Sequence, residues 1–209
     1  MSEEKLTQGV IMKAMDWAYD KAVNGVPGLD SASEMASDYL KGSGSLVDKA
    51  NSLIRWQNAK SATSGFVTGL GGLLLLPVTL PASITSILYV QLRMIAAIAV
   101  MGGYDVKDDR VKTLAYFCLV ASSAADVVRQ TGMTIGQKLA VEAIKGISRE
   151  TINKINQKVG FRLLTKFGEK GVVNLSKAVP VFSSLFNAVF DSISTNTVGN
   201  IARDTFIGK

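Results

Sequence analysis

The sequence contains no histidine, and its only cysteine is Cys118. Without histidine the chain cannot form a Ser-His-Asp or Cys-His catalytic relay. The usual zinc sites need histidine or several cysteines, so they are excluded as well. A lone cysteine cannot close a disulfide within the chain, and the apolar run of residues 114–120 around it predicts a buried, unreactive thiol. These absences argue against an enzyme, and we assign no catalytic residue, metal ligand or cofactor.

Charge is scarce in one long segment. Residues 61–103 hold a single charged side chain, Arg93, in 43 positions. Glycines and prolines interrupt the segment at Gly65, Gly69, Gly71, Gly72, Pro77 and Pro81. Because proline removes a helical hydrogen-bond donor and glycine weakens a helix, the segment is not one plain transmembrane helix. We expect a hydrophobic helical hairpin that either forms the centre of the core or enters lipid.

Signs of β-strands are also missing, because no useful length alternates between apolar and polar residues. Apolar residues instead recur at helical spacing between caps and glycine or proline stops. This pattern predicts an all-α fold, a single helical bundle around the central Gly/Pro-broken hairpin. Residues 1–60 are expected to pack as an N-terminal helical segment on the core of residues 61–209, giving one domain overall. The expected helices cover about residues 3–23, 33–41, 46–60, 81–101, 108–130, 134–145, 149–167 and a last one from residue 180.

Acidic residues mark two of the expected helix starts. Ser45 and Asp48 have the spacing of a capping box, with aspartate in place of the usual glutamate. Asp105, Asp108 and Asp109 invite comparison with a metal site, but they miss the calcium-loop spacing and its later glutamate. Capping of the helix that begins near Asp108 is therefore the expected role.

Positive charge gathers in one place. The net charge is +6, and residues 138–177, with nine basic and three acidic residues, account for all of it. Five basic residues recur there at every fourth position: Lys154, Lys158, Arg162, Lys166 and Lys170. An apolar stripe runs beside them: Ile152, Ile155, Val159, Leu163 and Phe167. The pattern predicts a basic amphipathic helix, the kind that binds anionic lipid headgroups.

Other roles for the basic residues are a solvated surface helix or a nucleic-acid contact. A solvated lysine face is the simpler alternative and stays open. Nucleic acid is disfavoured because no recognised binding motif is present and no aromatic residues interleave with the basic ones.

Two charged residues stand in apolar surroundings. Arg93 lies in the long uncharged segment, and Asp191 interrupts the last apolar run. A guanidinium in such a place must be paired or must reach water. We predict an ion pair between Arg93 and Asp191 that joins the central and final helices. The alternatives are a grip on a ligand carboxylate or phosphate, or a place for Arg93 at a helix edge.

Several stretches of roughly residues 60–209 resemble the EcsC family of bacterial proteins. They are GLGG (69–72), LPVTLP (76–81), LRMIAAIA (92–99), GYD (103–105), VGFRLLTK (159–166), GEKG (168–171) and the run from VPV (179–181) to Asp191. Together these stretches are specific, although each one alone is common. The resemblance leaves residues 1–60 without support.

The resemblance implies an all-helical protein near a bacterial membrane. Together with the basic stripe, it favours a non-enzymatic protein that binds an anionic membrane surface, at the cytoplasmic inner face, with a link to transport or envelope regulation. Two alternatives stay open. One is a soluble helical adaptor or regulator with a protein partner. The other is a hydrolase-like enzyme with an Arg/Asp-centred pocket that uses Tyr89, Asp105 or Lys112. The sequence does not fix the oligomeric state.

Overall fold

The computed structural model describes residues 7–61, 82–120, 141–175 and 195–208. Within these ranges the chain forms eight helices and no strand, which confirms the predicted all-α class. The helices are α1 (Gln8–Asn24), α2 (Ala32–Leu40), α3 (Leu46–Ser61), α5 (Ala82–Met101), α6 (Asp109–Val120), α8 (Val141–Lys145), α9 (Arg149–Leu175) and α11 (Thr195–Phe206). The first arm of the expected hairpin, residues 62–81, lies outside the described residues, and the second arm is α5.

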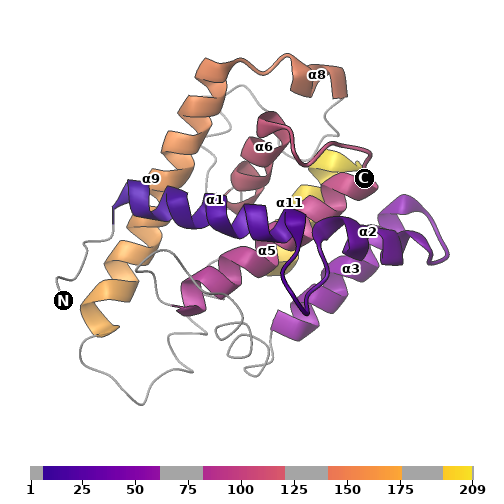
Figure 1. Ribbon diagram of the computed structural model, residues 1–209, viewed down its shortest axis with the longest axis horizontal. Coiled ribbons are helices and arrows are strands. Elements are labelled where there is room, and N and C mark those ends of the chain that lie inside the picture. The colour runs from indigo at the N-terminus through magenta and orange to yellow at the C-terminus, as the bar shows by residue number, and fades with distance from the viewer. Residues whose placement is uncertain (1–6, 62–81, 121–140, 176–194, 209) are drawn as a thin grey trace.

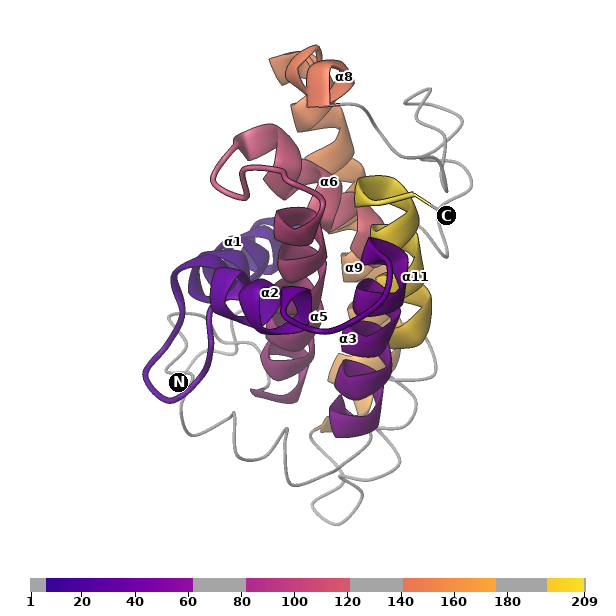
Figure 2. The ribbon, with the colours of Figure 1, turned by 90° about the vertical axis from the view of Figure 1, so that its right-hand side faces the viewer.

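Helix α5 lies at the centre of the fold. Helices α1, α2, α3, α6 and α11 all pack against it (Figures 1 and 2). Every residue from 85 to 99 is buried, including bulky side chains such as Leu88, Leu92 and Ile95. Because burial of apolar surface is the main favourable term in folding, this helix organises the core. None of the helices in the described ranges combines the length and hydropathy of a membrane span.

Side-chain caps fix the starts of two N-terminal helices. Ser45 and Asp48 form the expected capping box at α3: Asp48 N–H donates to Ser45 Oγ at 3.2 Å, and Ser45 N–H donates to Asp48 Oδ2 at 3.0 Å. A second box, which the sequence analysis missed, joins Ser31 and Glu34 at α2. The hydrogen bonds from Ser31 lower the pKa of Glu34. Each box satisfies backbone donors that a helix start leaves unpaired.

Two glycines allow α11 to approach its neighbours closely. A Cβ atom at Gly199 would lie 2.7 Å from Ile54 Cγ1 of α3 and 3.2 Å from Met94 Cε of α5. A Cβ atom at Gly102, directly after α5, would collide with the backbone oxygen of Phe206. These contacts seat α11 between α3 and the end of α5.

Helix α9 lies along the outside of the bundle, where it packs against α1 and α6 (Figure 1). It extends to Leu175, so the expectation that it ends near residue 167 was wrong. Gly168 and Gly171 lie inside the helix, where a glycine costs only about 1 kcal/mol relative to alanine. That cost does not end a long helix.

Candidate functional site

Three of the five predicted lipid-binding side chains lie together on the outer side of α9. Lys154 and Arg162 are exposed, and Lys158 is partly exposed. Because they are spaced four residues apart, each is rotated by about 40° from the one before. Lys166 and Lys170 belong to the same helix, but their side chains lie outside the described residues.

One of these basic residues carries a local counter-charge. Lys154 Nζ lies 2.6 Å from Glu150 Oε1, and both side chains are more than half exposed to solvent. The hydrogen bond and positive charge of Lys154 lower the pKa of Glu150. An exposed pair of this kind contributes little to stability. Its effect here is to weaken the positive potential at the first turn of the basic face.

Three of the five residues of the apolar stripe of α9 are buried in the bundle, while Ile152 is partly exposed and the Phe167 side chain lies outside the described residues. Ile155, Val159 and Leu163 are fully buried. Helices α1 and α6 are the neighbours that cover this side of α9. The stripe therefore serves the core in this structure, and the outer face of α9 is what remains for a ligand or partner.

An aromatic side chain that the sequence analysis overlooked lies on that outer face. Phe161 is 60% exposed, although its neighbours along the apolar stripe are buried. It follows Lys154 by seven residues, which is close to two helical turns, so the two side chains share one side of the helix. The statement that no aromatic residue interleaves with the basic ones was therefore wrong. The seven-residue spacing was the signal that could have placed Phe161 on this face.

Close packing against α1 fixes the rotation of α9. A Cβ atom at Gly160 would lie 2.8 Å from Gln8 Cγ and 3.1 Å from Met12 Cγ. Gln8 Nε2 also donates a hydrogen bond of 2.7 Å to the carbonyl oxygen of Gln157. With Gly160 held against α1, the next residue, Phe161, is turned about 100° away from that contact.

Arg93 is buried in the middle of α5, with 4% of its surface exposed. The alternative of a helix edge was therefore wrong. Its Nη1 donates a 3.2 Å hydrogen bond to the carbonyl oxygen of Asp30, and its Cζ lies 5.3 Å from the ring centroid of Tyr89. Asp191 lies outside the described residues, so the predicted ion pair with Arg93 stays a prediction. Within the described ranges no carboxylate forms a salt bridge with Arg93.

Arg93 ends a row of buried polar side chains on α5. Thr85, Tyr89 and Arg93 recur every four residues on one face of the helix, and Ser86 lies beside them. The Thr85, Ser86 and Tyr89 hydroxyls and Arg93 Nε are buried and have no hydrogen-bond partner in the described part of the chain. Burial raises the pKa of Tyr89. A cation beside hydroxyl donors in an apolar helix is an arrangement that favours a carboxylate or phosphate.

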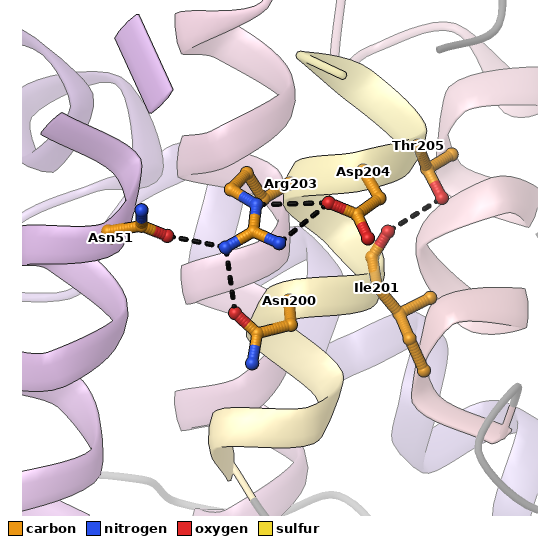
Figure 3. Close-up of polar contacts among 6 residues, drawn as sticks. All are labelled: Asn51, Asn200, Ile201, Arg203, Asp204 and Thr205. Carbon is orange, nitrogen blue, oxygen red and sulfur yellow. Dashed lines mark hydrogen bonds and ion pairs between the residues drawn. The ribbon is translucent and has the colours of Figure 1, made fainter. Parts of the chain in front are cut away.

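A second polar cluster joins α3 to α11 (Figure 3). Arg203 donates to Asp204 Oδ1 from Nε at 3.0 Å and from Nη2 at 2.7 Å. Its Nη1 donates to Asn51 Oδ1 on α3 at 2.6 Å and to Asn200 Oδ1 at 3.0 Å. Since four of the five guanidinium donors are used within the protein, the cluster serves as a structural joint.

Two of the three residues suggested for a hydrolase, Asp105 and Lys112, have structural partners. Lys112 Nζ lies 2.6 Å from Asp16 Oδ1, an oxygen that also accepts a 2.8 Å hydrogen bond from Tyr116 Oη. Asp105 Oδ1 accepts a hydrogen bond from Lys107 N–H. Burial is the main cause that raises the pKa of Tyr116. The Lys112 and Tyr116 contacts tie α1 to α6, and the Asp105 contact lies within the turn before α6.

Of the three aspartates near the start of α6, Asp108 caps the helix. Asp108 Oδ1 accepts a 2.7 Å hydrogen bond from Arg110 N–H at the first turn of the helix, as expected. Over the described ranges, no group of three or more Cys, Asp or Glu side chains is placed to hold a metal ion.

Comparison with known proteins gives one match. The model of the EcsC protein family matches residues 6–207. Neither the curated proteins nor the solved structures provided a match. The family match begins at residue 6, so the expectation that the resemblance is confined to roughly residues 60–209 was too narrow. The helices α1, α2 and α3, which pack on α5, are part of the family fold. The chain belongs to the EcsC protein family.

Proposed function

We propose that this protein is a non-enzymatic, membrane-associated helical protein that binds anionic lipid surfaces through the outer face of α9. The observation that carries the proposal is the placement of Lys154, Lys158 and Arg162. They follow one another along the outer face of α9, while the buried stripe of the same helix fixes that face outward. The helix as a whole contains six basic and two acidic residues. The net charge of the helix is therefore positive.

The size of the expected attraction follows from the charges. A basic residue close to an anionic bilayer contributes about 1 kcal/mol, and this contribution falls off within a Debye length of about 10 Å at 0.1 M salt. The Glu150 partner of Lys154 reduces the contribution of that residue. Binding should therefore be modest, reversible and strongly dependent on salt. Such a protein would reside at the cytoplasmic inner face of the membrane.

The proposal needs no release of the central helix. Residues 85–99 of α5 are buried among five other helices, and their insertion into lipid would require the bundle to open. The basic residues on the outer face of α9 can attract anionic lipid without any opening of the bundle. The proposed binding is therefore peripheral.

Vesicle flotation tests the proposal. Detergent-free protein is mixed with phosphatidylcholine vesicles, with or without phosphatidylserine, over a series of NaCl concentrations. We expect binding only to the vesicles with phosphatidylserine, weakening as salt rises, and loss of binding in the variant Lys158→Glu/Arg162→Glu/Lys166→Glu. A charge-matched control, Lys41→Glu/Lys49→Glu/Arg55→Glu on α3 and the turn before it, should retain most of the binding.

The control separates a local surface from net charge, because both variants change the net charge by the same amount. Equal loss in the two variants would refute a site on α9 and leave only nonspecific attraction. Absence of binding by a monodisperse wild-type protein would refute the proposal and favour the adaptor alternative with a protein partner.

A further inference from the structure

Phe161 is an exposed aromatic side chain that neither the core nor the charge of α9 explains. Only Leu40, Trp56 and Phe161 are exposed among the large hydrophobic residues that the structure describes, and Phe161 is the most exposed, at 60%. The contact of Gly160 with α1 and the burial of Val159 hold its part of α9 in place. Phe161 therefore cannot turn into the core unless α9 rotates.

Basic and polar side chains surround Phe161 on the outer face. Lys154 lies two helical turns before it, and Lys158 lies three residues before it. Arg162 follows it directly, and Gln157 is one turn before it; both are exposed. The phenyl ring thus lies beside charged and polar side chains, with the partly buried Leu164 three residues after it.

These surroundings fit a bilayer better than a protein partner. A protein–protein interface needs a contiguous core of apolar residues. Beside Phe161, Gln157, Lys158 and Arg162 are polar or charged, and Leu164 is partly buried against the core. In an anionic bilayer, headgroups accept hydrogen bonds from Lys158 and Arg162 while a single protruding ring enters the acyl boundary beneath them. Charge complementarity selects anionic lipid as the occupant.

We propose that Phe161 inserts into the interfacial region of an anionic membrane and that α9 lies parallel to the membrane plane with this face toward it. The inference rests on the proposed function of α9 and adds an apolar anchor to it. Binding then has two parts. The basic residues supply a part that salt screens, and Phe161 supplies a part that salt does not screen.

The two parts predict different responses to mutation. The variant Phe161→Ala should bind phosphatidylserine vesicles about tenfold more weakly at every salt concentration, because burial of part of the ring is lost. The dependence of binding on salt should stay as in the wild type. Charge reversal on α9 should instead remove the part of the binding that salt screens.

Trp56→Ala is the matched control. Trp56 is 53% exposed and lies on α3, which is not among the helices that pack against α9. The Trp56→Ala variant should bind vesicles as the wild type does. An equal loss in Phe161→Ala and Trp56→Ala would overturn the inference, since exposed aromatic area in general would then explain the effect.

Depth-dependent quenching gives a direct readout of insertion. Phe161→Trp is placed in a Trp17→Phe/Trp56→Phe background, so that the only tryptophan reports on position 161. On vesicles that contain brominated lipids, its fluorescence should shift to the blue and be quenched. A bound protein with unquenched, unshifted fluorescence would overturn the inference.

The outcomes also separate the two proposals. Salt-sensitive binding that is unchanged in Phe161→Ala would overturn the insertion of Phe161 and leave the electrostatic function standing. Absence of wild-type binding at every salt concentration would overturn both. Salt-sensitive binding with a uniform loss in Phe161→Ala and quenching at position 161 would support both.

Discussion

Replacement of Arg203 by methionine should destabilise the fold strongly. The guanidinium and the Asp204 carboxylate are 18% and 17% exposed, so both are largely removed from water. Methionine has a side chain of similar length but cannot donate hydrogen bonds. In the variant, Asp204 loses its partner at 2.7 Å, and the amide oxygens of Asn51 and Asn200 lose their donor.

The magnitude follows from the groups left behind. Breaking a fully buried ion pair by removal of one partner costs about 3–5 kcal/mol. Because the Arg203 and Asp204 side chains keep some contact with water, we expect the lower end of this range, about 3 kcal/mol. For a chain of 209 residues this corresponds to a fall in Tm of roughly 6–12 °C.

Urea unfolding followed by circular dichroism measures the effect. The double variant Arg203→Met/Asp204→Leu removes both charges, so it should lose less stability than the sum of its two single variants. A single variant Arg203→Met as stable as the wild type would refute the reasoning. Strict additivity of the two substitutions would refute the coupling between them.

Three further predictions concern the core. Gly199→Ala should lower the free energy of unfolding by about 1–2 kcal/mol, because overpacking against Ile54 of α3 outweighs the helix propensity gained. Gly9→Ala is the control, since its added Cβ atom would have only one contact, at 3.8 Å. In the same urea titration the control should be neutral or stabilising. Burial raises the pKa of Cys118 to about 12, so the native thiol should not react with a thiol reagent at pH 9. The thiol of the unfolded chain ionises near pH 9 and should react at once. Fast labelling of the native protein would contradict the burial of Cys118. If Asp191 pairs with Arg93 as predicted, replacement of either residue by an apolar one should lower the free energy of unfolding by about 3–5 kcal/mol, and the double replacement should lower it less. Calorimetry measures these changes. An Arg93→Ala variant as stable as the wild type would exclude the pair.

Local patterns in the sequence were enough to predict much of this fold. The capping box of Ser45 and Asp48 depends on residues three positions apart, and the structure contains it. The buried positions Ile155, Val159 and Leu163 follow from helical spacing alone, and all three are fully buried. These features depend on residues a few positions apart, so the sequence pattern was enough to predict them.

Features that depend on distant contacts could not be read in the same way. The exposure of Phe161 is decided by the contact between Gly160 and α1, which joins residues about 150 positions apart. The partner of Arg93 is the backbone carbonyl of Asp30, and a carbonyl has no residue type by which it can be recognised. The contacts of Arg203 were also missed, because its acceptor Asn51 lies far away in the sequence, on α3.

The central position of α5 has a consequence for synthesis of the chain. Helix α11, which covers one side of α5, begins about 90 residues after α5 ends. At about 5–20 residues per second, the ribosome needs roughly 5–20 s to complete that stretch. For this interval the nascent chain presents α5, the most apolar of the helices that the structure describes, without the cover of α11. Completion of the core around α5 therefore waits until the C-terminal segment emerges.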